Sequence, residues 1–181
     1  MTQRVMILAA NGFEQSELIK PKQNLEDAGI ETTVVSLESG SIKGWDEDDW
    51  GESVAVDKTV DAISSCEGFD ALLLPGGQMN PDILRMNDRA IAIVKEFAMA
   101  NKPIAAICHA PWLLAEADLL KGKTVTSWPS IRTDLTNAGA NVVDQEVAED
   151  GNFITSRNPD DIPAFSEALI ARVKDRVPEN A

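Results

Sequence analysis

Short apolar runs without polar spacing limit the fold of this chain more than any other feature. Such runs lie at residues 5–9, 71–74 and 104–107, and they are typical of strands that are buried on both faces of a sheet. Segments with apolar residues at helical spacing lie between them. Strands that alternate with helices predict an α/β protein with a three-layer, doubly wound, mostly parallel sheet, flavodoxin-like, that carries helices on both faces.

The same patterns place the individual elements. Strands are expected at residues 4–10, 30–37, 54–56, 69–74, 103–107 and 124–127, with partly antiparallel edge strands at 141–143, 146–148 and 153–155. Two short helical pieces are expected within residues 13–29, because Pro21 interrupts the pattern there. Further helices are expected at residues 60–64, 81–100, 111–117, 129–138 and 162–177, the last with an apolar stripe that ends at Val177. Residues 38–53 predict a hairpin-like excursion whose Trp45 and Trp50 either cap the sheet or serve an interface.

Length and charge exclude several classes of protein. The 181 residues are usual for one domain, so a single domain over residues 1–181 is expected. The formal net charge of −14 comes from 30 acidic against 16 basic residues, which makes nucleic acids and anionic membranes poor partners. The acidic run at residues 46–49 lacks the spacing of an EF-hand loop, and the chain has neither a P-loop nor a GxGxxG motif. We therefore expect no metal and no cofactor.

The cysteine content and the N-terminal segment indicate a cellular compartment. A chain of this size needs no disulfide, and Cys66 and Cys108 as free thiols favour a reducing environment. Only about five apolar residues follow Arg4, too few for the core of a signal peptide, and no apolar run approaches the roughly 18 residues of a membrane span. A cytoplasmic location is expected.

Cys108 lies at a position that favours nucleophilic chemistry. It follows the apolar run 103–107 without a spacer, and Pro111 begins a segment typical of a helix. A cysteine on such a strand-to-helix turn occupies a nucleophile elbow, where free N–H groups and the positive end of the helix favour a thiolate. A low thiol pKa is therefore predicted. The alternative is that Cys108 is a small buried apolar residue at the end of a strand.

The single histidine of the chain, His109, directly follows Cys108. Papain-like and glutaminase triads take their histidine from far along the chain, and this chain has no second histidine to supply. Any Cys/His chemistry must therefore use His109, and a glutaminase subunit is disfavoured.

Two further segments follow apolar strands in the same sense as Cys108. Glu14 comes just after the first strand, and Gly76-Gly77 closes the strand that ends at Leu74. In a parallel sheet these segments emerge at one edge, where they can converge. Paired glycines let a backbone N–H approach a reacting carbonyl or thiolate closely, although Gly77 also fits a simple tight turn.

The chain resembles the PfpI/ThiJ family of the class I glutamine-amidotransferase-like superfamily. The resemblance rests on Ala106-Ile107-Cys108-His109-Ala110-Pro111, Leu74-Pro75-Gly76-Gly77, Gly12-Phe13-Glu14 and Thr155-Ser156-Arg157-Asn158-Pro159-Asp160-Asp161. It covers roughly residues 4–173 and keeps the order and spacing of the motifs. Such a match is far more specific than a Cys-His pair alone.

The resemblance implies a role for each matching residue. Cys108 is the reactive group, Glu14 hydrogen-bonds its sulfur, and the backbone N–H of Gly77 contributes to an oxyanion pocket with the N–H of His109 as second donor. An acid from a neighbouring subunit orients the histidine, and the matching residue is Asp82. Here the acid is Asp rather than Glu, and its loop is one residue longer than in the family pattern. A homo-oligomer, dimer or hexamer, is therefore expected.

Two classes of function are compatible with these residues. The first is a cytoplasmic stress-response enzyme in which Cys108 attacks the carbonyl of a small or peptide substrate, either as a cysteine peptidase-like hydrolase or as a cofactor-independent glyoxalase or deglycase. The second is a non-enzymatic redox sensor or chaperone in which Cys108 is oxidised and held by Glu14. Both use the same thiol, so the sequence leaves both open.

Overall fold

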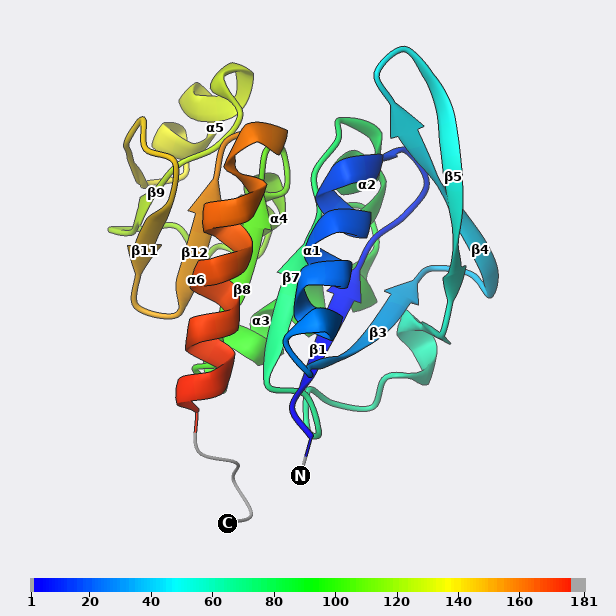
Figure 1. Ribbon diagram of the computed structural model, residues 1–181. Helices are drawn as coiled ribbons and strands as arrows, with labels where there is room; N and C mark the ends of the chain where they lie inside the picture. The colour runs from blue at the N-terminus through cyan, green and yellow to red at the C-terminus, as the bar shows by residue number, and fades with distance from the viewer. Residues whose placement is uncertain (1, 177–181) are drawn as a thin grey trace.

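The structure is a computed structural model that describes residues 2–176 (Figure 1). A seven-stranded sheet forms its centre, in the order β11-β12-β8-β7-β1-β3-β6. Its strands are β1 (Arg4–Leu8), β3 (Glu31–Ser36), β6 (Lys58–Thr59), β7 (Ala71–Leu74), β8 (Ile104–Ile107), β11 (Ala148–Asp150) and β12 (Phe153–Ser156). Only the edge pair β11 and β12 is antiparallel within this sheet. The predicted mostly parallel α/β fold is confirmed.

Helices cover both faces of the sheet. They are α1 (Gln15–Asp27), α2 (Met79–Leu84), α3 (Asp88–Met99), α4 (Pro111–Glu116), α5 (Arg132–Asn137) and α6 (Ile162–Asp175). Figure 1 shows α1 and α6 side by side on one face, with α3 and α4 on the other. Two apolar clusters follow from this arrangement, one on each face, and every residue of the central strands β7, β8 and β12 is buried between them. Continuous apolar strands are stable only when both faces are covered in this way.

Smaller elements complete the fold. A three-stranded sheet contains β2 (Phe13–Glu14), β4 (Gly40–Asp46) and β5 (Asp49–Val56), and a two-stranded sheet contains β9 (Thr124–Val125) and β10 (Asn141–Val142). Short 3₁₀ turns lie at Val60–Ala62, Pro129–Ile131 and Pro159–Asp161. The predicted excursion at residues 38–53 is thus a hairpin, and the strand expected at 54–56 is the end of β5.

Some predicted helix boundaries were wrong. Residues 15–27 form one helix despite Pro21, because Leu18, Pro21 and Leu25 bury one face of it and this packing offsets the lost backbone hydrogen bond. Residues 81–100 form two helices instead of one, since the side chain of Asn87 accepts a hydrogen bond from the Ala90 N–H and starts α3. The predictions at 60–64 and at the start of 129–138 are 3₁₀ turns. Val177 lies outside the described residues.

Candidate active site

Cys108 occupies the elbow that the sequence predicted. It lies between β8 and α4 with φ +65°, a conformation that is strained for any residue with a Cβ. Neighbouring backbone holds it there: the Cys108 N–H donates to the Ser156 carbonyl at 3.0 Å, and the Cys108 carbonyl accepts from the Trp128 N–H at 2.9 Å. The side chain is only 6% exposed. The fold thus fixes the thiol at the carboxyl edge of the sheet, beneath the surface.

The three predicted segments meet at this edge. Cys108, Gly77 and Glu14 follow β8, β7 and β1, which are neighbours in the sheet and run parallel. They line a cavity of about 710 Å³. Its other lining residues are Gly12, Glu17, Trp45, Glu47, Gln78, Met79, His109, Trp128 and Pro159. Trp45, one of the two hairpin tryptophans, is therefore part of this wall, and its ring packs edge-on against Trp50 at 5.4 Å between ring centroids.

Two backbone N–H groups face the sulfur of Cys108. Those of Gly77 and His109 both lower the pKa of the thiol. Gly77 has φ +82°, and a Cβ there would lie 2.5 Å from the Glu14 nitrogen. Only glycine fits this turn, and the close approach it allows brings the N–H to the sulfur. The two donors expected for an oxyanion pocket thus lie together.

The glutamate beside the thiol is Glu17, which was not predicted from the sequence. Its side chain is fully buried. Its carboxyl faces the Cys108 thiol and the N–H groups of Gly76 and Gly77, yet within residues 2–176 neither carboxyl oxygen has a well-aligned hydrogen-bond partner. Burial raises the pKa of Glu17 well above its usual range, because a buried carboxylate without full compensation is costly.

The sequence does contain a pattern that could have indicated Glu17 as a site residue. On α1 it shares the buried stripe with Leu18, Pro21 and Leu25, which recur at helical spacing. A glutamate on an apolar stripe at the carboxyl edge of a parallel sheet is either paired or functional. The expected break at Pro21 concealed the stripe, since it divided the helix on which the periodicity depends.

Glu14 lines the same cavity but does not take the role predicted for it. Its carboxylate accepts a hydrogen bond from the Ser16 hydroxyl at 3.2 Å. Partial burial, and to a smaller extent the nearby charges of Asp46 and Glu47, raise the pKa of Glu14. Glu14 ends β2 and precedes α1, so its side chain leaves the backbone before the helical turn that carries Glu17 to the sulfur.

Cys108 and Glu17 ionise as a pair. Burial raises the pKa of the Cys108 thiol, and a charge on Glu17 raises it further. These two effects outweigh the lowering of the pKa by the two N–H donors. The predicted low pKa therefore does not follow from the surroundings of the thiol. Because burial opposes charge on both groups, the pair carries at most one negative charge near neutral pH. A protonated Glu17 leaves that charge to the sulfur and donates a hydrogen bond to it.

His109 lies directly against the thiol. Its Nδ1 is 3.2 Å from the Cys108 sulfur, and the side chain is 8% exposed. The ring stacks on Trp128 and meets Trp112 edge-on, with ring centroids 5.9 Å and 5.2 Å away. Burial lowers the pKa of His109, so the imidazole is neutral at neutral pH and is placed to accept a proton.

Asp82 does not join the site within this chain. It lies on α2, its side chain is exposed, and it is not among the residues that line the cavity. The prediction that it orients a histidine concerns a neighbouring subunit and stays a prediction.

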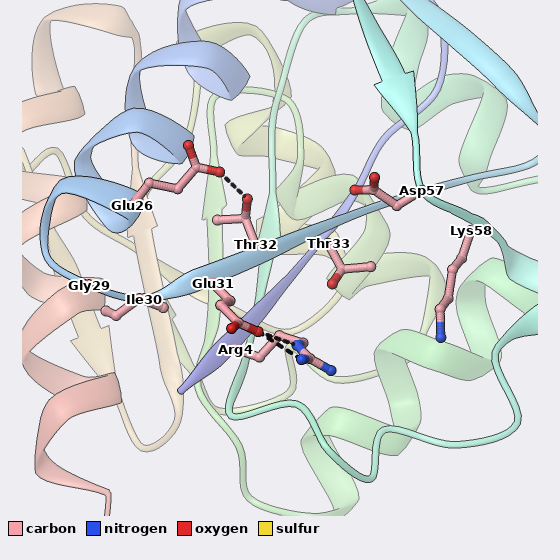
Figure 2. A pocket seen from close by; sticks show the side chains of 9 residues that line it. All are labelled: Arg4, Glu26, Gly29, Ile30, Glu31, Thr32, Thr33, Asp57 and Lys58. Atoms are coloured by element: carbon pink, nitrogen blue, oxygen red, sulfur yellow. Dashed lines mark hydrogen bonds and ion pairs between the residues drawn. The ribbon is translucent and has the colours of Figure 1, made fainter. Parts of the chain in front are cut away.

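A second hollow within residues 2–176 offers no competing centre. A hollow of about 540 Å³ at the amino ends of β1 and β3 (Figure 2) is lined by groups that pair with one another, such as Arg4 with Glu31 and Thr32 with Glu26. In residues 2–176 no group of three or more His, Cys, Asp or Glu side chains could hold a metal ion. No helix in the described part of the chain is long and apolar enough to cross a membrane.

Comparison with known proteins gives a consistent match across the chain. The model of the DJ-1/PfpI family matches residues 3–172. "Putative cysteine protease YraA" of Bacillus subtilis is 41% identical over 96% of this chain and all of its own. "Deglycase TK1284" of Thermococcus kodakarensis is 43% identical over 92% of this chain and 97% of its own. "General stress protein 18" of Bacillus subtilis is 42% identical over 94% and 98%.

Solved structures agree with this match. DJ-1beta of Drosophila melanogaster superimposes with a TM-score of 0.88 at 29% identity, over 97% of this chain and 92% of the other. A two-domain protein of Anabaena variabilis with DJ-1/ThiJ/PfpI-like and ferritin-like domains gives 0.89 at 36% identity, over 98% of this chain and 52% of the other. The similarity extends from the sequence to the arrangement of the sheet and helices.

Proposed function

This chain belongs to the DJ-1/PfpI family, and from the geometry of its site we propose that it is a cofactor-independent enzyme that processes small dicarbonyls or their adducts, as a glyoxalase or deglycase. One observation carries the proposal: the Cys108 sulfur is met by two backbone N–H groups, the neutral ring of His109 and the buried carboxyl of Glu17. Some relatives are themselves named deglycases.

The arrangement supports addition of sulfur to a carbonyl. The thiol proton passes to His109 Nδ1, the sulfur forms a bond to the aldehyde carbon, and the carbonyl π electrons move to oxygen. The N–H groups of Gly77 and His109 are placed to stabilise that oxygen if the carbonyl lies against the sulfur. Glu17, as a neutral acid, is a hydrogen-bond donor beside the same atoms.

The remaining steps need no external oxidant. For methylglyoxal, removal of the proton from the former aldehyde carbon and its return to the ketone carbon convert the hemithioacetal into a thioester. Water then cleaves the thioester and gives lactate and the free thiol. The aldehyde carbon is oxidised and the ketone carbon is reduced, so the electrons balance within the substrate itself. His109 and Glu17 therefore need only transfer protons.

The shape of the site favours small substrates over folded protein. The cavity volume of about 710 Å³ lies in the range of small-molecule pockets. Cys108 lies beneath the surface, where Trp45, Met79 and Trp128 form part of the surrounding wall. A short adduct fits a cavity of this volume, whereas a polypeptide segment with several side chains exceeds it. We therefore place peptidase activity second.

A substrate panel tests the proposal. Methylglyoxal, glyoxal, a glycated peptide and an unfolded protein are offered to the wild type, Cys108→Ser, His109→Ala and the control Cys66→Ala. We expect turnover of the first three substrates, its loss in the Cys108 variant, a fall of about 10²- to 10⁴-fold in kcat in the His109 variant and no change in the control. Cleavage of the unfolded protein alone would contradict the proposal.

A redox role is the second candidate, since the buried Glu17 carboxyl could also hydrogen-bond an oxidised Cys108. Cys66 is no resolving partner within the chain, because the two thiols belong to apolar clusters on opposite faces of the sheet. Reversible oxidation by peroxide without turnover of any panel substrate would favour this role.

The two free thiols are also compatible with the reducing cytoplasm, and we propose that the protein is located there.

A further inference from the structure

Asn80 makes three hydrogen bonds beneath the active site. It lies near the start of α2 and is completely buried. Its Oδ1 accepts from the Ala10 N–H at 2.7 Å, and its Nδ2 donates to the carbonyls of Pro75 and Gly76 at 2.9 and 3.1 Å. This side chain therefore ties the end of β1 to the turn after β7. Its bonding capacity is used almost fully, which is expected of a buried amide.

The two carbonyls that Asn80 holds belong to the peptide units that face the reactive groups. In a trans peptide the C=O and N–H point in opposite directions from one rigid plane. The plane of the Pro75 carbonyl carries the Gly76 N–H, which faces Glu17. The plane of the Gly76 carbonyl carries the Gly77 N–H, which faces the Cys108 sulfur. Fixing each carbonyl on the Asn80 side therefore aims each N–H toward the site.

We propose that Asn80 is a positioning residue that holds two successive peptide planes so that the Gly76 N–H faces Glu17 and the Gly77 N–H faces Cys108. Asn80 does not line the cavity and acts through the backbone.

The turn needs such a restraint. Gly76 and Gly77 have no side chains, and glycine peptides rotate with little steric resistance. A rotated Gly76-Gly77 plane would point its carbonyl, rather than its N–H, at the sulfur and would oppose a thiolate or an oxyanion. Among the described residues, the other backbone bond to the Gly76 carbonyl comes from the Glu14 N–H, at a longer 3.2 Å. Asn80 holds both planes at once, which this single bond cannot do.

The test compares Asn80 with a second buried asparagine. Asn152 donates to the Lys102 carbonyl at 2.9 Å at the opposite end of β8, so Asn152→Ala controls for loss of a buried amide. Asn80→Ala removes the amide without adding a titratable group, as the control does, and Asn80→Ser is a milder change for the case in which Asn80→Ala does not fold. Thermal unfolding identifies folded variants, and the pH profile of Cys108 alkylation by iodoacetamide is then measured.

We expect the alkylation midpoint to move up by about one pH unit in the Asn80 variants, because the Gly77 N–H no longer stabilises the thiolate. The titratable groups around the thiol, Glu17 on α1, Glu14 on β2 and His109 after β8, are unchanged, and Asn152→Ala keeps the wild-type midpoint. On an active substrate, kcat falls about 10- to 100-fold with little change in KM.

Two outcomes would overturn the proposal. One is a folded Asn80 variant with the midpoint of the wild type. The other is an Asn152 variant whose midpoint moves as far as that of the Asn80 variants. The inference deepens the proposed function, but alkylation needs no substrate, so it is tested even if every substrate of the panel fails.

Discussion

At the scale of single residues, Glu17 decides how Cys108 ionises. A carboxyl held neutral by burial can donate to the sulfur, whereas a charged carboxyl would repel the thiolate. We predict that Glu17→Gln keeps a donor beside the sulfur and that Glu17→Leu removes it. The alkylation midpoint of Glu17→Leu should therefore lie about one to two pH units above that of Glu17→Gln, the usual strength of a hydrogen bond to a charged group.

Glu14 supplies the matched control for this comparison. Its carboxylate bonds to Ser16 rather than to the sulfur, so Glu14→Gln and Glu14→Leu should give nearly the same midpoint. A larger difference between the Glu14 variants than between the Glu17 variants would restore the role that the family resemblance implied for Glu14.

The sequence indicated Cys108 and His109 as candidates because both residue types are rare in this chain and the two residues are adjacent. It could not identify the state of the thiol. The predicted low pKa came from the helix end, but α4 has only six residues, and burial opposes a buried thiolate more strongly than two N–H groups favour it. Burial depends on which loops cover the elbow, and that information is not local.

At the scale of elements, the turn after β7 is the least replaceable piece of backbone near the site. Gly77 has φ +82° and no room for a Cβ, whereas Gly68 has φ +83° with nothing within 4 Å of the added atom. We predict that Gly68→Ala costs about 1–2 kcal/mol of unfolding free energy, the strain of the left-handed conformation alone. Gly77→Ala should cost about 3 kcal/mol or more, since clashes with backbone are added. Urea unfolding of both variants measures the difference, and equal costs would contradict the close packing of the turn.

The strands could be predicted better than the helix boundaries. Continuous apolar runs predicted β1, β7 and β8, because no other element tolerates burial on both faces over so few residues. The predictions that depended on Pro21 and Asn87 were wrong in opposite directions. One is accommodated by burial of its face, and the other starts a new helix inside an apparently continuous pattern. Both outcomes depend on tertiary packing that local spacing does not contain.

At the scale of the whole molecule, the order of the strands in the sheet brings the residues of the site together. The adjacency of β8, β7 and β1 brings together residues more than 90 positions apart, such as Glu17 and Cys108. The parallel sense of these strands was predictable, and so was the convergence of their loops at one edge. The placement of the β4–β5 hairpin, which carries Trp45 to the cavity wall, was not predictable from its polar composition.

The surface of α2 bears on how the molecule assembles. Asp82 is exposed there, Met79 at the start of α2 is 37% exposed, and Met86, just after the end of α2, is 79% exposed. Methionine is over-used at adaptable binding surfaces, and Met79 also lines the cavity beside His109. We propose that this surface meets a second copy of the chain and that Asp82 of one subunit approaches His109 of the other, in a dimer or hexamer.

A subunit-mixing experiment tests this assembly. If Asp82 acts across the interface, Cys108→Ala and Asp82→Asn chains are each inactive, but a mixed oligomer contains sites with an intact Cys108 on one chain and an intact Asp82 on its neighbour. In a dimer after free exchange, half of the molecules are mixed and each holds one complete site, so about a quarter of the wild-type activity should return. Light scattering and mass spectrometry of differently labelled chains establish exchange. An active monomer, or mixtures that stay inactive despite exchange, would leave Cys108, His109 and Glu17 to act within one chain.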